Sequence, residues 1–546
     1  MFKPFRSVLG LRPRLTKWNL SYTKKFTTDM GKLIPIMCDE AVPGDVWSIG
    51  NRCVVRFQPL VAPILHEVSV YTHYFFVPYR LLWSDWEDFI TGGEEGTYVG
   101  TLPSLSQARI DEGLTDLQAW KLGGLWDYLY NGVPVSSTSG WSVEGAARLD
   151  FDSIISFPLF AYNLIWNEYY RDENVDDEVS LTNFDLLFRR WKKDYFTAAL
   201  PWRQRGVAPA LPVSVSFSSG SFPEILSVDS ATTQAGVNTV MVNPIIGPSQ
   251  ATTPQFRLAS ASADDFSQVA GTVNENLGLQ FRNYLNSVVS STTFDVNDLR
   301  LAFQVQKWLE RNARSGARYT EQLRAHFGVS PNDDRLQRPE YIGGTKQGVI
   351  FSEVLQTSST GQTGATTPQG NMAGHGLSAD GNFAGKYKVR EYGLIMGIMS
   401  VVPKSTYSYG VNRQWLRETK YDFYFPEFAH LGEQAIQFRE LWENFAVGTS
   451  EESNSTGIFG YQGRYDEMRY KPSTVHSGMR KTFNYWHLSR EFSSCPHLNS
   501  AFLECNPSKR IFADQQSDGL IIDFANVITA LRPIPYIAEP GLVDHF

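Results

Sequence analysis

The segment DVWSIGNRCVVRFQ, residues 45–58, alternates apolar and polar side chains with a period of two. Its apolar positions are Trp47, Ile49, Cys53, Val55 and Phe57, and its polar positions are Ser48, Arg52, Arg56 and Gln58. This alternation is typical of a β-strand that has one buried face and one face in water. Two prolines, Pro59 and Pro63, follow and end the strand. The segment therefore predicts that the core of the fold is built from β-sheet.

Other apolar runs predict further strands. In residues 67–77, one parity is apolar and holds Val68, Val70, Tyr74 and Phe76. We expect this strand to pair with residues 45–58 in an antiparallel sheet with one wet face. Strands resume at residues 389–402, and a last strand pair is expected within residues 510–532, where the stretch 520–531 is strongly apolar.

Four segments have the apolar spacing of an α-helix. A short helix is expected at residues 81–90, ended by the two glycines at 92–93. Apolar residues also recur at helical spacing in residues 161–170, and residues 184–196 are a further candidate. Residues 295–328 have the strongest helical pattern, interrupted by a serine and a glycine.

Residues 206–290 differ sharply in composition. Up to residue 273, Ser, Thr, Ala, Val, Gly and Pro dominate, and five residues are charged: Glu224, Asp229, Arg257, Asp264 and Asp265. Such a stretch buries little large apolar surface, so it predicts a loop-rich or small β insertion that is exposed. Two interpretations stay open. The insertion is either a plain surface excursion or a recognition surface, with the five charged residues facing a receptor.

These elements predict a mainly β protein, an antiparallel eight-stranded jelly-roll sandwich or barrel with long insertions that contain helices. We expect one domain over residues 41–546, with a mixed helical insertion at 80–205. Residues 343–385 hold ten glycines with many Ser and Thr, which predicts a long loop. Three prolines in residues 533–546 predict an extended tail that lies on this subunit or on a neighbour.

Residues 1–40 are expected to form a basic N-terminal arm. The first 28 residues contain seven of the 49 Lys and Arg of the chain and none of its 57 Asp and Glu. Aromatic residues lie between these cations, and this combination grips single-stranded nucleic acid without sequence preference. The alternative is a tail with incidental charge. We expect the following residues to face DNA: Lys3, Arg6, Arg12, Arg14, Lys17, Trp18, Lys24 and Lys25.

Composition excludes several classes of protein. The net charge is −8, unlike that of a chain that binds nucleic acid by overall basicity. Four cysteines in 546 residues are too few for a disulfide scaffold, and no signal peptide or membrane-spanning apolar run is visible. Aromatic residues make up 14% of the chain, which fits either extensive interfaces or a large β-rich core.

No catalytic or metal-binding motif is complete. Four possible zinc ligands, His487, Cys495, His497 and Cys505, do not have the spacing of a structural zinc site. We expect no metal and no cofactor, although acidic clusters leave a structural calcium site open without an EF-hand motif to support it. The same clusters, together with the aromatic residues, leave open a secreted carbohydrate-active enzyme or a lectin-like sandwich. An enzyme of this kind would need the signal sequence that is not seen.

Several long segments resemble the major capsid protein of microviruses, specifically of the gokushovirus branch. The most specific matches are LAFQVQKWLERNARSGARYTEQLRAHFGV at 301–329 and RLQRPEYIGG at 335–344. Others run in order along the chain: GKLIPIMCDEAVPGDVW at 31–47, THYFFVPYRLLWSDWEDFI at 72–90, AYNLIWNEYYRDEN at 161–174, DYFTAALPWRQRG at 194–206, YDFYFPEFAHLGEQ at 421–434, FGYQGRYDEMRYKPS at 459–473 and PGLVDHF at 540–546. The match is weakest at 207–290 and 345–385.

The resemblance implies a non-enzymatic coat protein that assembles with copies of itself into a T=1 icosahedral shell around circular single-stranded DNA. It implies a location in the virion, made and assembled in the cytoplasm of a bacterial host. It also implies that an insertion protrudes at the three-fold axes, and residues 206–283 are the candidate for host attachment. The implied partners are a pilot protein, an internal scaffolding protein, a small basic DNA-binding protein and a host surface receptor.

Overall fold

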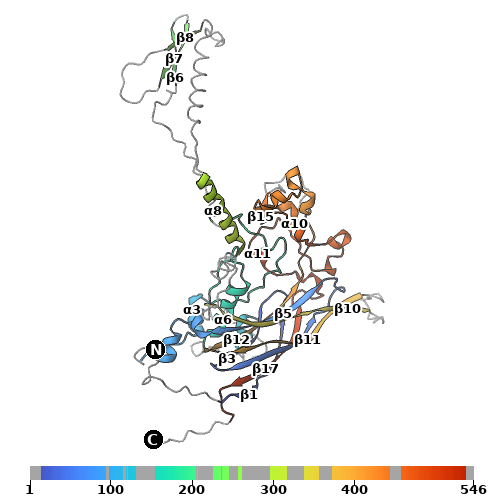
Figure 1. Cartoon of the computed structure of the whole chain (residues 1–546). Helices are drawn as coiled ribbons and strands as arrows, with labels where there is room; N and C mark the ends of the chain where they lie inside the picture. The colour runs from blue at the N-terminus through green and yellow to red at the C-terminus, as the bar shows by residue number, and fades with distance from the viewer. Residues whose placement is uncertain are drawn as a thin grey trace. The chain divides into compact units, whose positions relative to one another are not determined.

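The computed structural model describes most of the chain (Figure 1). The described residues are 14–93, 97–114, 119, 121–130, 154–204, 206, the strand segments 226–234, 237–244 and 256–260, and residues 296–315, 337–355, 372–442 and 457–536. They divide into two compact units. One unit holds Met1–Arg203 with Ala313–Phe546, and the other holds Gln204–Asn312.

The first unit contains a six-stranded antiparallel sheet. Its order is β1(Thr16–Asn19), β17(Leu520–Arg532), β4(Val46–Phe57), β11(Met372–Lys388) and β10(Ile350–Leu355), and β2(Tyr22–Thr28) pairs with β17 beside β1. The long apolar run near the C-terminus therefore lies next to the alternating strand near the N-terminus. The predicted strand at residues 45–58 is confirmed, whereas the expected pair within 510–532 is the single strand β17 preceded by a 3-10 turn, η10(Lys509–Ile511).

A second, four-stranded antiparallel sheet faces the first. Its order is β3(Ile34–Ala41), β12(Gly393–Pro403), β5(Val68–Pro78) and β9(Glu340–Gly348). The strands predicted at residues 67–77 and 389–402 are therefore confirmed. Their expected partner is wrong, however, because β5 pairs with β12 and β9, while β4 belongs to the other sheet.

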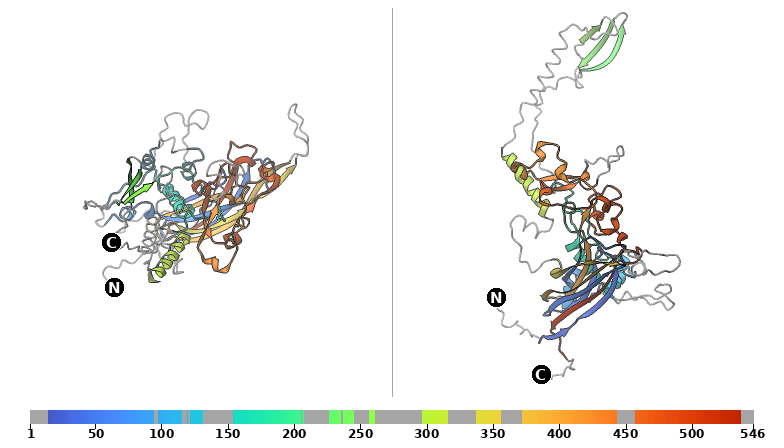
Figure 2. Two further views of the ribbon diagram at one scale, coloured as in Figure 1. Left: turned by 90° about the horizontal axis from the view of Figure 1, so that it is seen from above. Right: turned by 90° about the vertical axis from the view of Figure 1, so that its right-hand side faces the viewer.

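A hydrophobic core fills the space between the two sheets, which lie face to face (Figure 2). Trp47, Ile49 and Phe524 come from the six-stranded sheet, and Tyr74 and Ile395 come from the four-stranded sheet. All five side chains are 0% exposed. The prediction of a mainly β, antiparallel sandwich is confirmed. The described residues place six and four strands in the two sheets, so the eight-strand jelly-roll connectivity stays a prediction.

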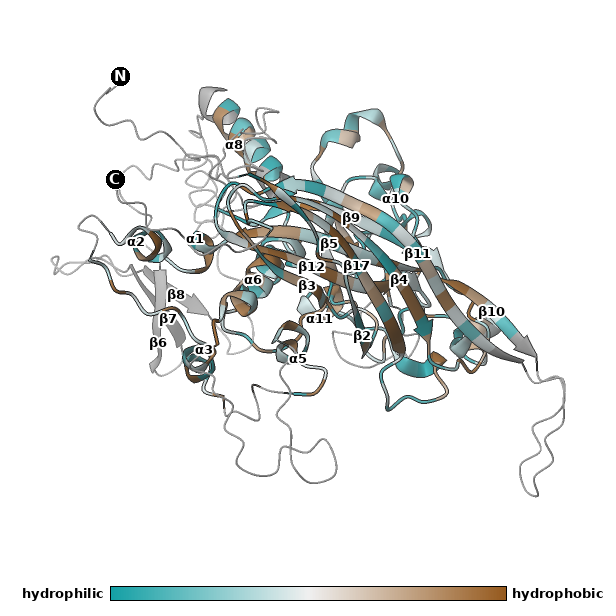
Figure 3. Cartoon of the chain, turned by 90° about the horizontal axis from the view of Figure 1, so that it is seen from below, coloured by the Kyte–Doolittle hydropathy of each residue, from teal (hydrophilic) through white to brown (hydrophobic). Residues whose placement is uncertain are grey.

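Helices cover the outer face of the four-stranded sheet. Leu394, Met396 and Ile398 of β12 point away from the sandwich core and into a second buried cluster with the helical residues. The helices and turns of this layer are α1(Tyr79–Leu82), α2(Trp86–Thr91), α3(Leu105–Asp111), α5(Leu125–Tyr130), α6(Phe157–Ile165) and the π-helix η1(Trp166–Tyr170). Because it is covered on both sides, β12 is buried at every position and is drawn largely in brown in Figure 3.

The predicted helices are partly correct. The helix at 161–170 is confirmed as α6 followed by η1. The helix at 81–90 is two short helices, α1 and α2, and the second ends at Gly92 with a left-handed φ of 82°, as a C-terminal glycine allows. The strongest prediction is confirmed as α8(Val296–Ser315), and its continuation to residue 328 lies outside the described residues.

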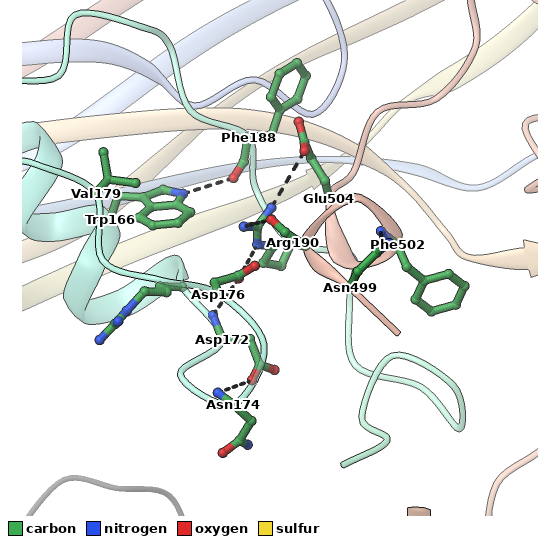
Figure 4. A network of polar contacts seen from close by, with 12 residues as sticks. Trp166, Asp172, Asn174, Asp176, Val179, Phe188, Arg190, Asn499, Phe502 and Glu504 are labelled. Atoms are coloured by element: carbon green, nitrogen blue, oxygen red, sulfur yellow. Dashed lines mark hydrogen bonds and ion pairs between the residues drawn. The ribbon is translucent and has the colours of Figure 1, made fainter. Parts of the chain in front are cut away.

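The helix predicted at residues 184–196 is wrong. This segment is irregular and makes isolated bridges instead, from Phe188 to Lys32 and from Arg190 to Glu504. Figure 4 shows the anchor of this segment, the Arg190 guanidinium between Asp176 and Glu504. The Arg190–Asp176 ion pair measures 2.8 Å, and the Asp176 side chain is only 2% exposed, so the pair anchors the segment at Arg190.

The long loop predicted at residues 343–385 is also wrong, because most of its described part forms β9, β10 and β11. Its glycines serve close packing between strands. A Cβ atom on Gly343 would lie 2.2 Å from the carbonyl oxygen of Ala384, and one on Gly376 would lie 2.8 Å from the Phe351 ring. Glycine in a strand can thus mark close approach of neighbouring groups as well as a loop.

Residues 16–40 do not form a free arm. β1 and β2 pair along their whole length with β17, and β3 lies in the four-stranded sheet. Lysines on a strand of this kind are common at sheet edges, where they discourage pairing with other chains. The basic character that predicts an arm is therefore, in residues 16–28, that of edge strands. Residues 1–13 lie outside the described residues.

The rest of the first unit surrounds a third buried cluster that includes Tyr195, Phe196, Ile436 and Phe459. It contains one small parallel sheet and one small antiparallel sheet. Its elements are β13(Thr406–Tyr407), η3(Arg413–Trp415), η4(Lys420–Asp422), η5(Pro426–His430), β14(Glu433–Gln437), η6(Phe438–Glu440), β15(Ile458–Gly463), α10(Asp466–Arg469), β16(Ser473–Thr474), η8(Ser477–Arg480), η9(Asn484–Trp486) and α11(Ser500–Leu503).

The second unit contains a three-stranded antiparallel sheet, β6(Leu226–Gln234), β7(Val237–Pro244) and β8(Phe256–Ser260), and most of α8. The three strands agree with the small β insertion predicted at residues 206–290. Across both units, the described helices include none that is both long and apolar enough to cross a membrane.

Candidate functional site

Among the residues that the structure describes, no helix covers the outer face of the six-stranded sheet, and the outward side chains of β4 between Asn51 and Phe57 are exposed. Along β4, side chains alternate strictly between buried and exposed from Asn51 to Phe57, so Arg52 and Arg56 point outward. The outward positions of β1, β2 and β11 add four more cations. We call these six exposed side chains the basic face: Lys17, Lys25, Arg52, Arg56, Lys386 and Lys388.

Register places the six cations on the same side of the sheet. Residues directly opposite in an antiparallel pair point to the same face. Lys388 lies opposite Val46, which lies opposite Leu531, which lies opposite Lys17. At the other end, Lys25 lies opposite Asp523. Asp523 is the one carboxylate among the outward residues of β1, β2, β17, β4 and β11 in this part of the described chain.

None of the six cations makes an ion pair with a carboxylate of the described residues. Their charges are therefore available to an outside anion. A sheet surface with spaced cations and few competing acids can neutralise the phosphates of a nucleic acid strand. The basic face can thus bind a polyanion over most of the width of the sheet.

Some of the predicted DNA-facing residues lie within the part of the chain that the structure describes, and these residues lie on both sides of this sheet. Lys17 and Lys25 belong to the basic face, and Arg14 is exposed just before β1. Lys24 does not belong to the basic face, because its side chain points inward and its ammonium donates to the carbonyl of Tyr128 at 3.1 Å. Burial lowers the pKa of Lys24, while the nearby Cys38 and Asp39 oppose that shift.

Trp18 also lies on the inward parity of β1 and is half-buried. Its ring stacks on Tyr536, with the ring centroids 5.6 Å apart and the planes 18° apart. This face of the indole is therefore occupied within the chain. The remaining predicted DNA-facing residues, Lys3, Arg6 and Arg12, lie outside the described residues.

Four residues of the basic face are absent from the set predicted from the sequence. Arg52 and Arg56 could have been found, because the alternation in residues 45–58 places them on the wet parity. Lys386 and Lys388 could not, because the glycine-rich stretch before them is typical of a loop. Once β11 is recognised as a strand next to β4, its outward lysines complete the basic face.

A second cationic region lies on the other outer face of the sandwich, beyond β5. Here a basin of about 710 Å³ has a floor of aromatic rings that includes Tyr71, His73 and Tyr341. The guanidinium of Arg189 lies 4.2 Å from the centre of the Tyr71 ring and donates to the Ser400 hydroxyl at 2.9 Å. We call this region the aromatic basin. Cations line this basin, but they are not spread over a broad exposed surface as those of the basic face are.

The network of polar contacts in Figure 4 holds the wall of the aromatic basin in place. Arg190 bonds to Asp176, donates to the Ser500 hydroxyl at 3.0 Å and lies 5.2 Å from the Trp166 ring centre. Beneath the wall, His73 Nδ1 and the Tyr170 hydroxyl are 2.8 Å apart. Burial, aided by the charge of Arg189, lowers the pKa of His73 to about 4.

Two of the predicted receptor-facing residues are placed on strands. Asp229 lies at a bulge in β6, between Val228 and Ser230, and Arg257 lies on β8 opposite Met241. The other three, Glu224, Asp264 and Asp265, lie outside the described residues. The strands bring Asp229 and Arg257 into one three-stranded sheet.

Two of the candidate metal ligands, His487 and Cys505, have different surroundings. His487 Nε2 lies 2.7 Å from the carbonyl oxygen of Met479, and Cys505 is fully buried, where burial raises the pKa of its thiol. The described residues include no group of three or more His, Cys, Asp or Glu side chains placed to hold a metal ion.

The known proteins that this chain resembles are capsid proteins. A family described as "Capsid protein (F protein)" matches residues 12–542. The capsid protein VP1 of Chlamydia phage 1 is 32% identical over 590 aligned residues, which cover 97% of this chain and 96% of that protein.

Two further capsid proteins named VP1 are similar over nearly the whole chain. That of Bdellovibrio phage phiMH2K is 31% identical, covering 99% of this chain and 98% of its own length. That of Spiroplasma virus 4 is 28% identical, covering 94% and 93%. The chain therefore belongs to the phage F-type capsid protein family and is the structural major capsid protein of a gokushovirus-type virion.

Proposed function

We propose that copies of this chain occupy the sixty equivalent positions of a T=1 icosahedral shell and that the shell encloses circular single-stranded DNA. The observation that carries this proposal is the basic face, six cations on an uncovered sheet that form no ion pair with the described carboxylates. In a shell subunit, this face lies toward the genome. The acidic remainder of the chain then lies in contacts between subunits and on the outer surface.

Phosphate contacts supply most of the binding in this arrangement. Each cation that neutralises a phosphate releases a condensed counterion, so binding weakens as salt rises. The described part of the basic face has no aromatic cluster of the kind that reads or stacks bases, apart from the exposed Phe383 on β11. The contact is therefore independent of sequence, as a coat around a whole genome requires.

The N-terminal segment extends this contact. Lys3, Arg6 and Arg12 precede β1 in the sequence. β1 carries Lys17 and lies at an edge of the six-stranded sheet. In the proposal, these cations meet DNA beside the basic face. The net charge of −8 limits how much of the genome one coat chain neutralises. A small basic DNA-binding protein therefore shares the task, and a pilot protein and an internal scaffolding protein are further proposed partners.

Removal of residues 1–13 tests the role of this segment. A deletion of residues 1–28 would also remove β1 and β2 and so disrupt the sheet. With the shorter deletion, we expect shells in normal yield that retain less DNA, measured by the absorbance ratio of purified particles. Shells with a normal genome content would contradict the role of the segment.

We also propose that the insertion at residues 206–283 is the surface for host attachment. Its support is its low charge, its separate compact unit and its small β-sheet, which suit an exposed and replaceable surface. Shells that lack residues 210–280 should assemble but lose adsorption to host cells. Full adsorption by such shells would end this part of the proposal.

We propose that the chain has no catalytic activity. A carbohydrate-active enzyme would behave as a monomer in size-exclusion chromatography and would hydrolyse a polysaccharide. Negative-stain microscopy of the purified protein distinguishes the two functions directly. We expect closed shells, and a monomer with measurable turnover would refute the capsid function.

A further inference from the structure

The segments 415–431 and 464–471 expose an unusual number of large apolar side chains. Eight of them are between 46% and 74% exposed: Trp415, Tyr421, Phe423, Tyr424, Phe425, Leu431, Met468 and Tyr470. We call this surface the aromatic patch. Large exposed apolar patches are uncommon on soluble monomers, and they mark interaction sites.

Hydrogen bonds and ring contacts within the chain hold the aromatic patch in place. Arg464 donates to the carbonyl of Tyr421 at 2.8 Å, and the Tyr465 hydroxyl donates to the carbonyl of Phe423 at 2.9 Å. Rings also hold one another, with the centres of Tyr424 and Tyr465 5.1 Å apart. A preorganised surface loses little conformational entropy on binding.

Charges within the patch are balanced by its own residues. The two segments contain five Lys and Arg and five Asp and Glu. Arg417 pairs with Glu467 at 3.6 Å, and Arg469 pairs with Asp466 at 2.5 Å. Asp422 accepts hydrogen bonds at the start of η4, mainly from Thr419. Burial opposes the shift, but these bonds together lower the pKa of its carboxyl. The patch therefore offers aromatic surface with no net charge.

We propose that the aromatic patch binds the same patch of a second copy of this chain, across a two-fold axis. This inference rests on the proposed shell, whose icosahedral symmetry supplies two-fold axes. A two-fold contact places each surface against itself, so a charged surface repels its copy. The neutral aromatic patch avoids that repulsion, whereas the basic face, with six cations and one carboxylate, cannot pair with itself. Aromatic residues with paired charges are also what the centres of interfaces contain.

Opposite charges at Tyr424 test the self-contact. Tyr424→Asp and Tyr424→Lys each place like charges near the axis in every pair of copies. Each variant alone should need at least about tenfold more protein to assemble, as for loss of one central interface residue. An equimolar mixture should restore assembly, because unlike copies then pair. Phe383→Asp, which changes an exposed aromatic on the basic face, should gain nothing from a Phe383→Lys partner.

Crosslinking gives a readout that does not depend on assembly yield. Tyr424→Cys shells treated with a short bismaleimide should give covalent dimers, and dissociated subunits should not. The unsubstituted chain, with Cys38, Cys53, Cys495 and Cys505, and the Phe383→Cys variant report the background. Circular dichroism of each variant confirms that it folds.

The outcomes separate this inference from the proposed function. If the unsubstituted chain forms no shells, the shell itself is refuted. If shells form but Tyr424→Cys gives no dimers above background, the two-fold contact is refuted while the shell stands. Normal assembly of both Tyr424→Asp and Tyr424→Lys, or no rescue on mixing, would also overturn it.

Discussion

The two outer faces of the sandwich differ in what covers them. The outward residues of β12, such as Met396, are buried beneath α1, α5, α6 and η1. The outward residues of β4, such as Arg52, are exposed. Both strands lie at the centre of an antiparallel sheet and contribute inward residues to the same core.

This difference shows how one sandwich can serve two purposes. The chain between β5 and β9 supplies the helices that cover the four-stranded sheet. In the described part of the chain, the six-stranded sheet has no helical cover, and its six outward cations are exposed. The covered face thus contributes to stability, and the bare face is free to bind. Paired changes on the two faces should therefore give opposite results.

The largest difference is expected from a lysine placed on each face. Met396→Lys puts a charge into the buried helical layer and should cost more than about 4 kcal/mol of unfolding free energy, or prevent folding. Val54→Lys adds the same side chain to the bare face, where Val54 is 37% exposed. It should change stability by less than about 0.5 kcal/mol. Urea denaturation measures both, and similar losses would show that the two faces are equally covered.

The next effect concerns DNA. Replacing Arg52, Arg56 and Lys386 together by Gln should weaken binding of dissociated subunits to oligo(dT) roughly tenfold or more at low salt. The slope of log affinity against log salt should fall by about two. The control replaces Lys192, which lines the aromatic basin, and Lys346, whose ammonium lies 5.7 Å from the centre of the Tyr71 ring on its floor. This pair of changes should leave the slope unchanged. The opposite pattern would assign DNA to the basin.

Neighbouring lysines on β2 sharpen the comparison further. Lys25→Gln removes one cation of the basic face and should lower the salt slope by about 0.7. Lys24→Gln should leave the slope unchanged, because the Lys24 ammonium points inward to the Tyr128 carbonyl. Equal effects on the slope would mean that β2 does not present alternate faces as its register requires.

The smallest effect is on pH dependence. Burial lowers the pKa of His73, on the covered side, to about 4, below its unfolded value of about 6.5. The unfolded chain therefore binds more protons between pH 6.5 and 4, so the folded state loses stability as pH falls through that window. From pH 7 to 5, the unsubstituted chain should lose on the order of 1 kcal/mol more than His73→Gln. His66 shifts in the same direction in both proteins and cancels in the difference.

Alternation along the chain is enough to predict the main strands and the wet side of β4. In residues 45–58, the period of two alone places Arg52 and Arg56 on the polar side. The same rule applied to residues 22–28 separates Lys24 from Lys25, but the density of positive charge around them favours an arm instead. Local pattern therefore identifies strands and faces wherever it is applied consistently.

Local pattern cannot show which strands pair, because pairing depends on contacts between distant segments. β4 meets β17 across more than 400 residues of chain, a contact that no local period reveals. Local pattern also cannot explain the glycines at 343 and 376. At Gly343 a neighbouring carbonyl, and at Gly376 a neighbouring ring, leaves no room for a Cβ atom. The basic face depends on both facts, which explains why only part of it can be predicted from the sequence.

Lysine acetylation in full and empty particles tests the central claim most directly. Comparing DNA-filled particles with DNA-free shells separates protection by the genome from protection by subunit contacts that both particles share. We predict that Lys17, Lys25, Lys386 and Lys388 are protected in full particles and reactive in empty ones, while Lys192 and Lys346 react equally in both. Protection of Lys192 and Lys346 instead, with the basic face equally reactive in both particles, would contradict the assignment of the bare sheet to the genome.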